Sequence, residues 1–216
     1  GTILNPGDVF SFNDIVGERT AAKGYQAATV FVSGTSTPEL GGGVCQVAST
    51  IYYCALKADL NILERQAHMF TVSYVPMGMD ATIYWGSDVD LRFENSTGYP
   101  LRIDAAVSDD GYVHVALVGT KTTDTTVEVD CRIVTTTEWE DVVEEDETQP
   151  ADYEEVTQSP YTGYQTVTYK RYLDAAGNPV SDWEEVQRPY SNYQKRDRIT
   201  TVGKQPDEEE LPEETP

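Results

Sequence analysis

The stretch that decides the fold and the chemistry of this chain is residues 41–50, GGGVCQVAST. Glycine lacks a Cβ, so three glycines in a row allow a sharp turn and a close approach to another group. The spacing of the apolar residues that follow predicts a helix over 45–57, which places Cys45 in its first turn. That turn offers unpaired N–H groups and the positive end of the helix dipole, which stabilise a thiolate and can hold an oxyanion. We therefore interpret Cys45 as a candidate nucleophile.

The alternative interpretation of Cys45 is a buried, inert thiol, since free cysteine is among the most buried residue types. Helical spacing separates the candidates, because it predicts a buried stripe of Val47, Ile51, Cys54, Ala55 and Ala58. Cys54 is then structural, and Cys45 is expected on the opposite side of the helix. Cys131 can pair with Cys54 in a disulfide, but we expect both thiols to be free.

A nucleophilic cysteine needs a base, and the chain contains 2 histidines. His68 precedes a strand-like run, which can return it beside Cys45. His114 alternates with apolar residues, so it is expected on the solvated face of a strand. A third group usually orients the base. For this role we prefer Asp80, with Tyr74 and Glu64 as the alternatives.

Several distinctive motifs lie between about residues 5 and 118: NPG (5–7), FSFN (10–13), GY (24–25), GGGVCQ (41–46), YVP (74–76), DAT (80–82) and DLRFEN (90–95). Together they resemble the VanW family of cell-surface proteins. The family was first associated with glycopeptide-resistance gene clusters, and some members are understood to act as L,D-transpeptidases on peptidoglycan. By position, the resemblance makes Cys45 the nucleophile and His68 the base. The family usually has RHPHS where this chain has RQAHM (65–69), so one of the two usual histidines is absent.

The resemblance implies acyl transfer between cell-wall stem peptides, through a thioester on Cys45 to 3→3 crosslinks. The expected oxyanion donors are the backbone N–H groups of Gly43, Val44 and Gln46, or the Gln46 amide, which can equally brace the loop. Ser49 lies one turn after Cys45 on the same face, where it either lines the cleft or is merely solvated. A non-catalytic module that binds peptidoglycan is the alternative function.

Composition excludes several other function classes. With 15 basic and 37 acidic residues among 216, the net charge of −22 repels nucleic acid. The cysteines lack the paired spacing of zinc ligands, and the glycines lack the Gly-Lys-Ser/Thr ending of a phosphate-binding loop. We therefore expect no metal and no cofactor. The expected partners are peptidoglycan stem peptides and glycan, and the expected state is a monomer.

Localisation is inferred from the resemblance and from the start of the chain. No apolar run is long enough to span a membrane, and no signal peptide is recognisable. The chain begins at Gly1 inside a motif of the resemblance. We therefore expect an extracellular part of a longer protein, held at the cell surface by a membrane anchor that precedes Gly1.

Charge and composition divide the chain near a threonine-rich run at 120–126. We predict a VanW-like domain over 1–120, with an α+β fold of one main helix and an antiparallel sheet. Its strands are expected near 69–75, 81–85, 89–94, 100–107 and 112–118.

The part that follows is expected to be a small, elongated all-β domain over 127–204. Within it, the segment from YTGY (161–164) through ITTVG (199–203) resembles a G-five domain, which implies sugar binding or a spacer role. Its tyrosines are expected to stack on sugar rings or to cover a thin sheet; they are Tyr161, Tyr164, Tyr190 and Tyr193. Residues 205–216 are acidic and are expected to form a disordered tail.

Overall fold

The computed structural model of this protein describes residues 1–32 and 35–204. These residues are mostly β with largely antiparallel strand pairing. They divide into two compact units, of which the first joins Gly1–Thr135 to Tyr164–Tyr193 and the second joins Thr136–Gly163 to the residues from Gln194 on. The boundary predicted at 120–126 lies inside the first unit. The predicted tail, 205–216, lies outside the described residues.

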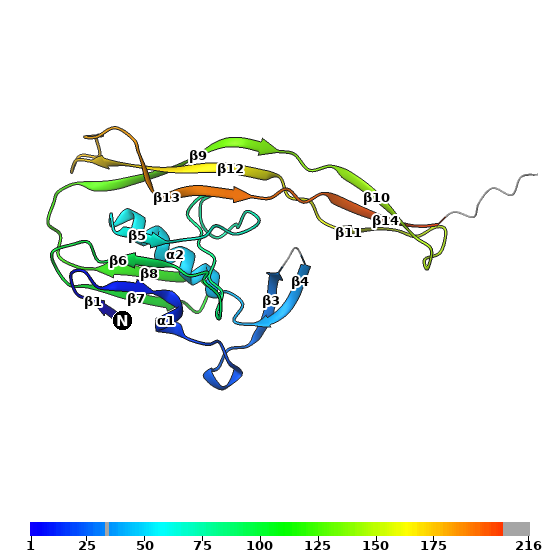
Figure 1. Cartoon of the computed structure of the whole chain (residues 1–216), viewed down its shortest axis with the longest axis horizontal. Coiled ribbons are helices and arrows are strands. Elements are labelled where there is room, and N and C mark those ends of the chain that lie inside the picture. The colour runs from blue at the N-terminus through cyan, green and yellow to red at the C-terminus, as the bar shows by residue number, and fades with distance from the viewer. Residues whose placement is uncertain (33–34, 205–216) are drawn as a thin grey trace, which may run out of the picture. The chain divides into compact units, whose positions relative to one another are not determined.

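The first unit holds the helices and most of the strands (Figure 1). Its helices are α1 (Phe12–Val16), the 3₁₀ turn η1 (Ala21–Lys23) and α2 (Val44–Lys57). The strands before residue 120 are β1 (Thr2–Leu4), β2 (Val9–Ser11), β3 (Ala27–Val32), β4 (Thr35–Leu40), β5 (Asn61–Glu64), β6 (Arg92–Glu94), β7 (Leu101–Val107) and β8 (Val113–Val118). They form a β1-β7-β8 sheet, a β2-β6-β5 sheet and a β3-β4 pair.

Three later strands form a further sheet in the order β13-β12-β9. They are β9 (Thr126–Thr137), β12 (Gly163–Leu173) and β13 (Glu184–Tyr193). A hydrogen-bonded turn at 174–178 lies between β12 and β13, which pair in antiparallel fashion. This sheet belongs with the earlier strands, because β13 packs against β5 and Val186 is part of the same apolar core.

The second unit is a sheet of three strands in the order β10-β14-β11. The strands are β10 (Asp141–Asp146), β11 (Glu154–Gln158) and β14 (Arg198–Gly203). β10 and β14 run parallel, whereas β11 is antiparallel to β14. Within the described residues, no helix has the length and apolar character needed to cross a membrane.

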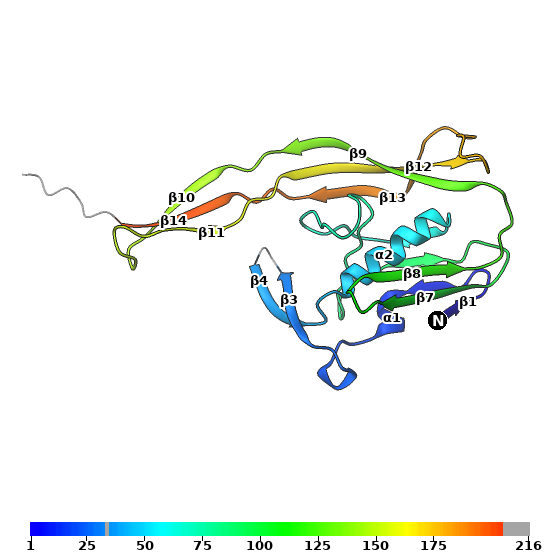
Figure 2. The ribbon, with the colours of Figure 1, turned by 180° about the vertical axis from the view of Figure 1, so that it is seen from behind.

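Helix α2 is the central element of the core, and it packs against β8, as both views show (Figure 1, Figure 2). The helix begins at Val44, one residue before the predicted start. Its buried face differs from the predicted stripe, because Ala58 is exposed and Val47 and Cys54 are only half-buried. The residues that are buried are Ala48, Ser49, Ile51, Tyr52, Ala55 and Leu56.

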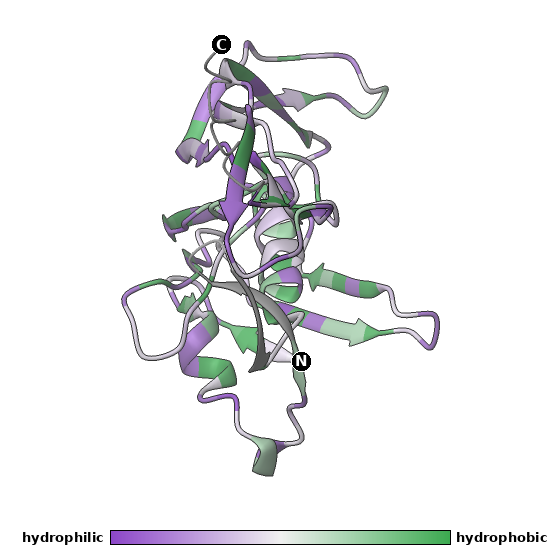
Figure 3. Ribbon diagram, turned by 90° about the vertical axis from the view of Figure 1, so that its right-hand side faces the viewer, coloured by the Kyte–Doolittle hydropathy of each residue, from purple (hydrophilic) through white to green (hydrophobic). Residues whose placement is uncertain are grey.

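The strands predicted after the helix are confirmed in part. The runs at 89–94, 100–107 and 112–118 contain β6, β7 and β8. Residues 69–75 are loop rather than strand, and 81–85 contribute only an isolated bridge between Thr82 and Gln66. Figure 3 shows the hydropathy of each residue along the ribbon, and β8 alternates between half-buried and exposed residues.

Candidate active site

Each of the three glycines before α2 occupies a position where a side chain would be strained or would clash. Gly41 and Gly43 adopt φ angles of 93° and 86°, a left-handed conformation that other residues rarely adopt. Gly42 lies against β3, where an added Cβ would come within 2.3 Å of the Cβ of Ala28. The expected sharp turn and close approach are therefore present, although the approach is to a neighbouring strand. The turn delivers Cys45 to the first turn of α2.

Most N–H groups of this first turn are already engaged. Val44 donates to the carbonyl of Gly41 at 3.2 Å, and Gln46 donates to the carbonyl of Gly43 at 3.1 Å. The main-chain N–H groups of Val44 and Gln46, which are predicted oxyanion donors, are therefore engaged within the turn in this conformation. Among the residues that the structure describes, the N–H of Cys45 has no acceptor.

Ser49 ties the nucleophile helix to the loop that carries Asp80. Its hydroxyl donates to the Cys45 carbonyl at 2.7 Å and accepts from the N–H of Ala81 at 2.9 Å. Ser49 is 0% exposed, so it neither lines an open cleft nor is solvated. Cys45, one turn before it, packs against the core, which corrects the expectation that this cysteine lies opposite the buried face.

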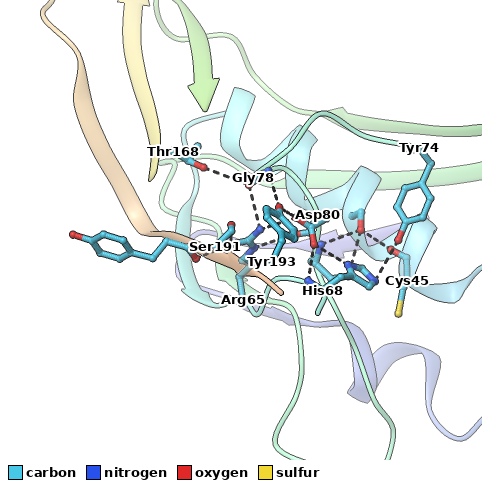
Figure 4. Close-up of polar contacts among 12 residues, drawn as sticks. Cys45, Arg65, His68, Tyr74, Gly78, Asp80, Thr168, Ser191 and Tyr193 are labelled. Carbon is cyan, nitrogen blue, oxygen red and sulfur yellow. Dashed lines mark hydrogen bonds and ion pairs between the residues drawn. The ribbon is translucent and has the colours of Figure 1, made fainter. Parts of the chain in front are cut away.

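Cys45 comes from α2, and His68 and Asp80 both come from the long connection between β5 and β6 (Figure 4). Nδ1 of His68 lies 2.8 Å from Oδ2 of Asp80, and the His68 main-chain N–H donates to the same oxygen at 2.7 Å. Figure 4 shows the imidazole with Asp80 on one side and with Cys45 and Tyr74 on the other. The Tyr74 hydroxyl lies 3.3 Å from Nε2 of His68. The loop, rather than the expected strand, thus brings the imidazole to the thiol.

The electrostatics of the group favour a thiolate beside an imidazolium. Burial raises the pKa of the Cys45 thiol, but nearby His68, the hydrogen bond to the Ile83 carbonyl and the charge of Arg19 more than offset it, so the pKa is lowered. Burial lowers the pKa of His68, while Asp80 and Cys45 raise it to a net value of about 9. Burial likewise opposes ionisation of Asp80, but His68 and Arg65 bring its pKa down to about 2. In contrast, burial raises the pKa of Cys54 and of Cys131.

The alternative third group, Glu64, and the second histidine, His114, lie away from the Cys45–His68–Asp80 group. The Glu64 carboxylate accepts from the N–H of Asp90 at 3.2 Å and faces Arg92, so it does not contact His68. His114 is exposed on β8, as predicted. The three cysteines are free thiols.

Several residues of the site were missed by the sequence analysis. Arg65, three residues before His68, forms an ion pair with Asp80 at 2.9 Å, with side chains 1% and 0% exposed. The Arg19 guanidinium lies over the ring of Trp85 and donates to Asn13. Tyr193 is 2% exposed and its hydroxyl donates to Asp80, so this tyrosine is not available to stack on a sugar ring. An arginine shortly before a candidate base is a sequence signal for a carboxylate partner. No sequence feature near Tyr193 indicates its role.

A family model described as VanW like protein matches residues 1–118, more than half of the chain. The chain therefore belongs to the VanW family. The uncharacterized protein YoaR of Bacillus subtilis (strain 168) is 44% identical over 103 residues, which are 48% of this chain and 34% of that protein. The vancomycin B-type resistance protein VanW of Enterococcus faecalis (strain ATCC 700802 / V583) is 29% identical over 115 residues, 51% of this chain and 42% of that protein. The chain thus spans less than half the length of either relative.

Two solved G5 domains also match part of the chain. The IgA1 protease G5 domain has a TM-score of 0.26 at 15% identity and covers 39% of this chain and 98% of that domain. The G5 domain of HP0197 has a TM-score of 0.21 at 12% identity and covers 38% of this chain and 100% of that domain. Both TM-scores are too low to show a shared fold.

Proposed function

We propose that this chain is a cysteine-dependent acyltransferase that acts on peptidoglycan stem peptides as an L,D-transpeptidase. The observation that carries the proposal is the assembly of a thiol, an imidazole and a buried carboxylate at the first turn of α2. This is the arrangement of an activated nucleophile, in which a base is held by a third group. The part of the chain up to residue 120 is then a catalytic α+β domain.

In the first half-reaction, the Cys45 thiolate attacks the carbonyl that joins the diamino acid of the donor stem to its terminal D-amino acid. The C–N bond breaks as the imidazolium of His68 gives its proton to the leaving amine. The products are a thioester on Cys45, a neutral imidazole and a free D-amino acid. Because Asp80 holds Nδ1, the nitrogen that exchanges the proton is Nε2.

In the second half-reaction, the side-chain amine of an acceptor stem attacks the thioester. The neutral His68 takes the proton of this amine, a 3→3 amide bond forms, and the Cys45 thiolate leaves. A peptidase variant of the same reaction uses water in place of the amine and shortens the stem. Tyr74, within 3.3 Å of Nε2, is placed to hold the imidazole during both proton transfers.

The tetrahedral intermediates carry a negative oxygen that needs hydrogen-bond donors. The main-chain N–H of Cys45 is the candidate that the turn leaves available among the described residues, with Gly43 and the Gln46 side chain next to it. Arg19 adds positive charge near the thiol. One such donor lowers the activation barrier by about 3 kcal/mol.

A cell-surface location and a peptidoglycan substrate fit the membership of the VanW family, one relative of which is named for vancomycin resistance. The C-terminal part is proposed to be a G-five-like β domain that contacts glycan or acts as a spacer. Its exposed Tyr190 is available for stacking on a sugar ring, whereas Tyr193 is not.

The test is mass spectrometry of muropeptides after incubation of tetrapeptide stems with the protein and with its Cys45→Ala variant. Dimers with 3→3 links, formed only with Cys45 present, are the expected result. Shortened tripeptides alone would replace the transpeptidase with a carboxypeptidase. Untouched stems would favour the non-catalytic wall-binding module.

A further inference from the structure

The Asp80 carboxylate is shared between two groups of donors, one on each oxygen. Oδ2 accepts from the main chain and the ring of His68, at 2.7 and 2.8 Å. Oδ1 accepts from Nη2 of Arg65 at 2.9 Å and from the hydroxyl of Tyr193. A carboxylate offers about four acceptor positions, so this one is fully used. Its orientation is therefore fixed by the donors on Oδ1 as much as by the imidazole.

Tyr193 and Ser191 reach this carboxylate from β13, far along the chain from Asp80. They lie two positions apart, so the alternation of a strand directs both side chains to the same face. They are 2% and 3% exposed, whereas Asn192 between them is exposed. The Ser191 hydroxyl accepts from Nη1 of Arg65 at 2.8 Å. β13 thus holds Asp80 directly through Tyr193 and indirectly through Arg65.

The turn that carries Asp80 is also fastened to this sheet. The N–H of Gly78 donates to the Tyr193 hydroxyl at 2.8 Å, and the Gly78 carbonyl accepts from Arg65 at 3.3 Å. A Cβ at Gly78 would lie 2.7 Å from both Cys131 Sγ and Thr168 Oγ1. The Tyr193 hydroxyl therefore accepts a hydrogen bond from the Gly78 N–H and donates one to the Asp80 carboxylate. These two hydrogen bonds fix the position of the carboxylate relative to Gly78.

Other contacts hold the sheet against the helix that carries Cys45. Asp59, just after α2, accepts from the Lys170 ammonium and from the Tyr172 hydroxyl on β12, the latter at 2.7 Å. Val186 of β13 is 5% exposed in the common core. The neighbouring strand β12 is thus anchored beside α2.

We propose that Tyr193 is a positioning residue of the active site, which holds the Asp80 carboxylate so that Oδ2 faces His68, with Ser191 supporting it through Arg65. The functional unit therefore extends beyond residues 1–118 and includes β13. This inference rests on the proposed function, because it assigns Tyr193 to the Cys45–His68–Asp80 group. The role is one of orientation, since the phenol contacts neither Cys45 nor the reacting atoms.

The test compares Tyr193→Phe with Tyr112→Phe, which removes the same hydroxyl from a side chain that is 66% exposed. Two readouts are followed against pH: the rate at which iodoacetamide modifies Cys45, and the NMR titration of His68, with exposed His114 as the internal reference. Without the Tyr193 hydroxyl, the carboxylate is free to rotate away from the imidazole. The titration midpoint of His68 then falls and that of Cys45 rises, so alkylation at pH 7 slows by about tenfold, the factor that one pKa unit represents.

Tyr112→Phe is expected to leave both midpoints unchanged. Tyr193→Phe with unchanged midpoints, or with faster alkylation, would overturn the proposal. Circular dichroism reports whether Tyr193→Phe folds. If it does not, Ser191→Ala decides the question by the same readouts, with a smaller shift in the same direction expected and no shift contradicting the proposal.

The two proposals fail in different experiments. Absence of any product from stem peptides would overturn the transpeptidase and leave the shifts of Tyr193→Phe intact. Unchanged midpoints in Tyr193→Phe would remove the positioning role even if the wild-type protein makes 3→3 links.

Discussion

The main chain and the ring of His68 both bind Oδ2 of Asp80, at 2.7 and 2.8 Å. Two donors from one residue on one acceptor fix the imidazole plane relative to the loop at 77–80. They also commit Nδ1, so that Nε2 is the ring nitrogen left for proton exchange. A short turn, rather than the predicted strand, therefore positions the base. Asp80 in this turn binds both the main-chain N–H and the ring of His68.

The first prediction concerns the three thiols. At neutral pH, iodoacetamide should modify Cys45 well before Cys54 and Cys131, because the pKa of Cys45 is lowered and burial raises those of the other two. Peptide mapping by mass spectrometry after short exposure measures the order. Equal labelling of all three, or protection of Cys45 in the folded protein, would contradict an activated thiol.

The second prediction separates the two histidines. His68→Ala should slow alkylation of Cys45 at pH 7 by about tenfold or more, because the thiolate loses its imidazolium partner. His114→Ala should have no effect, since His114 is exposed on β8. Pseudo-first-order rates over a pH series provide the measurement. Equal slowing by both substitutions would remove His68 from the mechanism.

The third prediction concerns acid stability. The folded pKa of Asp80, about 2, lies below the ordinary value of 3.8. The stability that this carboxylate contributes is therefore fully present above pH 4 or so, and it is lost as the pH falls through about 2. As the pH falls from about 4 to about 2, the unfolding free energy of the wild-type protein should fall by about 2 kcal/mol more than that of Asp80→Asn.

At neutral pH, Asp80→Asn should be less stable by about 3 kcal/mol, because the buried Arg65 guanidinium loses its counter-charge. Urea unfolding of both proteins at several pH values measures both effects. If the unfolding free energies of the two proteins change with pH in parallel, Asp80 is not an ionised carboxylate in the folded state.

The fourth prediction tests the glycine turn. Gly42→Ala should destabilise the protein by about 1–3 kcal/mol, because the new methyl group meets the Cβ of Ala28. It should also slow alkylation of Cys45, since the turn that sets the start of α2 must shift. Gly98→Ala is the matched control, because nothing lies within 4 Å of a Cβ at that position. Thermal unfolding and alkylation rates are the measurements, and equal behaviour of the two variants would contradict the close approach.

The helix and the nearby part of the site were predictable because their signals are local. The glycine turn, the start of α2 and the exposed face of β8 follow from spacing within a few residues. The burial of α2 was harder, because its contacts come from both β8 and the loop at 81. As a result, the predicted stripe includes the exposed Ala58 and omits the buried Ser49.

The contacts that span the chain could not be read from periodicity. Asp80 and Tyr193 are 113 positions apart, and nothing near either residue encodes their hydrogen bond. The alternation of Ser191 and Tyr193 predicts a shared face, but not what that face meets. The short strands β1 to β5 were missed because three to six residues carry too little pattern. Residues 69–75 form a loop, although their β-like composition predicts a strand.

The most direct test of the central claim is the release of the terminal D-amino acid from tetrapeptide stems. The wild-type protein is compared with Cys45→Ala and with Cys54→Ala, which alters the same helix outside the site. The account predicts release by the wild-type protein and by Cys54→Ala, and none by Cys45→Ala. Release by Cys45→Ala at the wild-type rate, or no release by the wild-type protein, would contradict it.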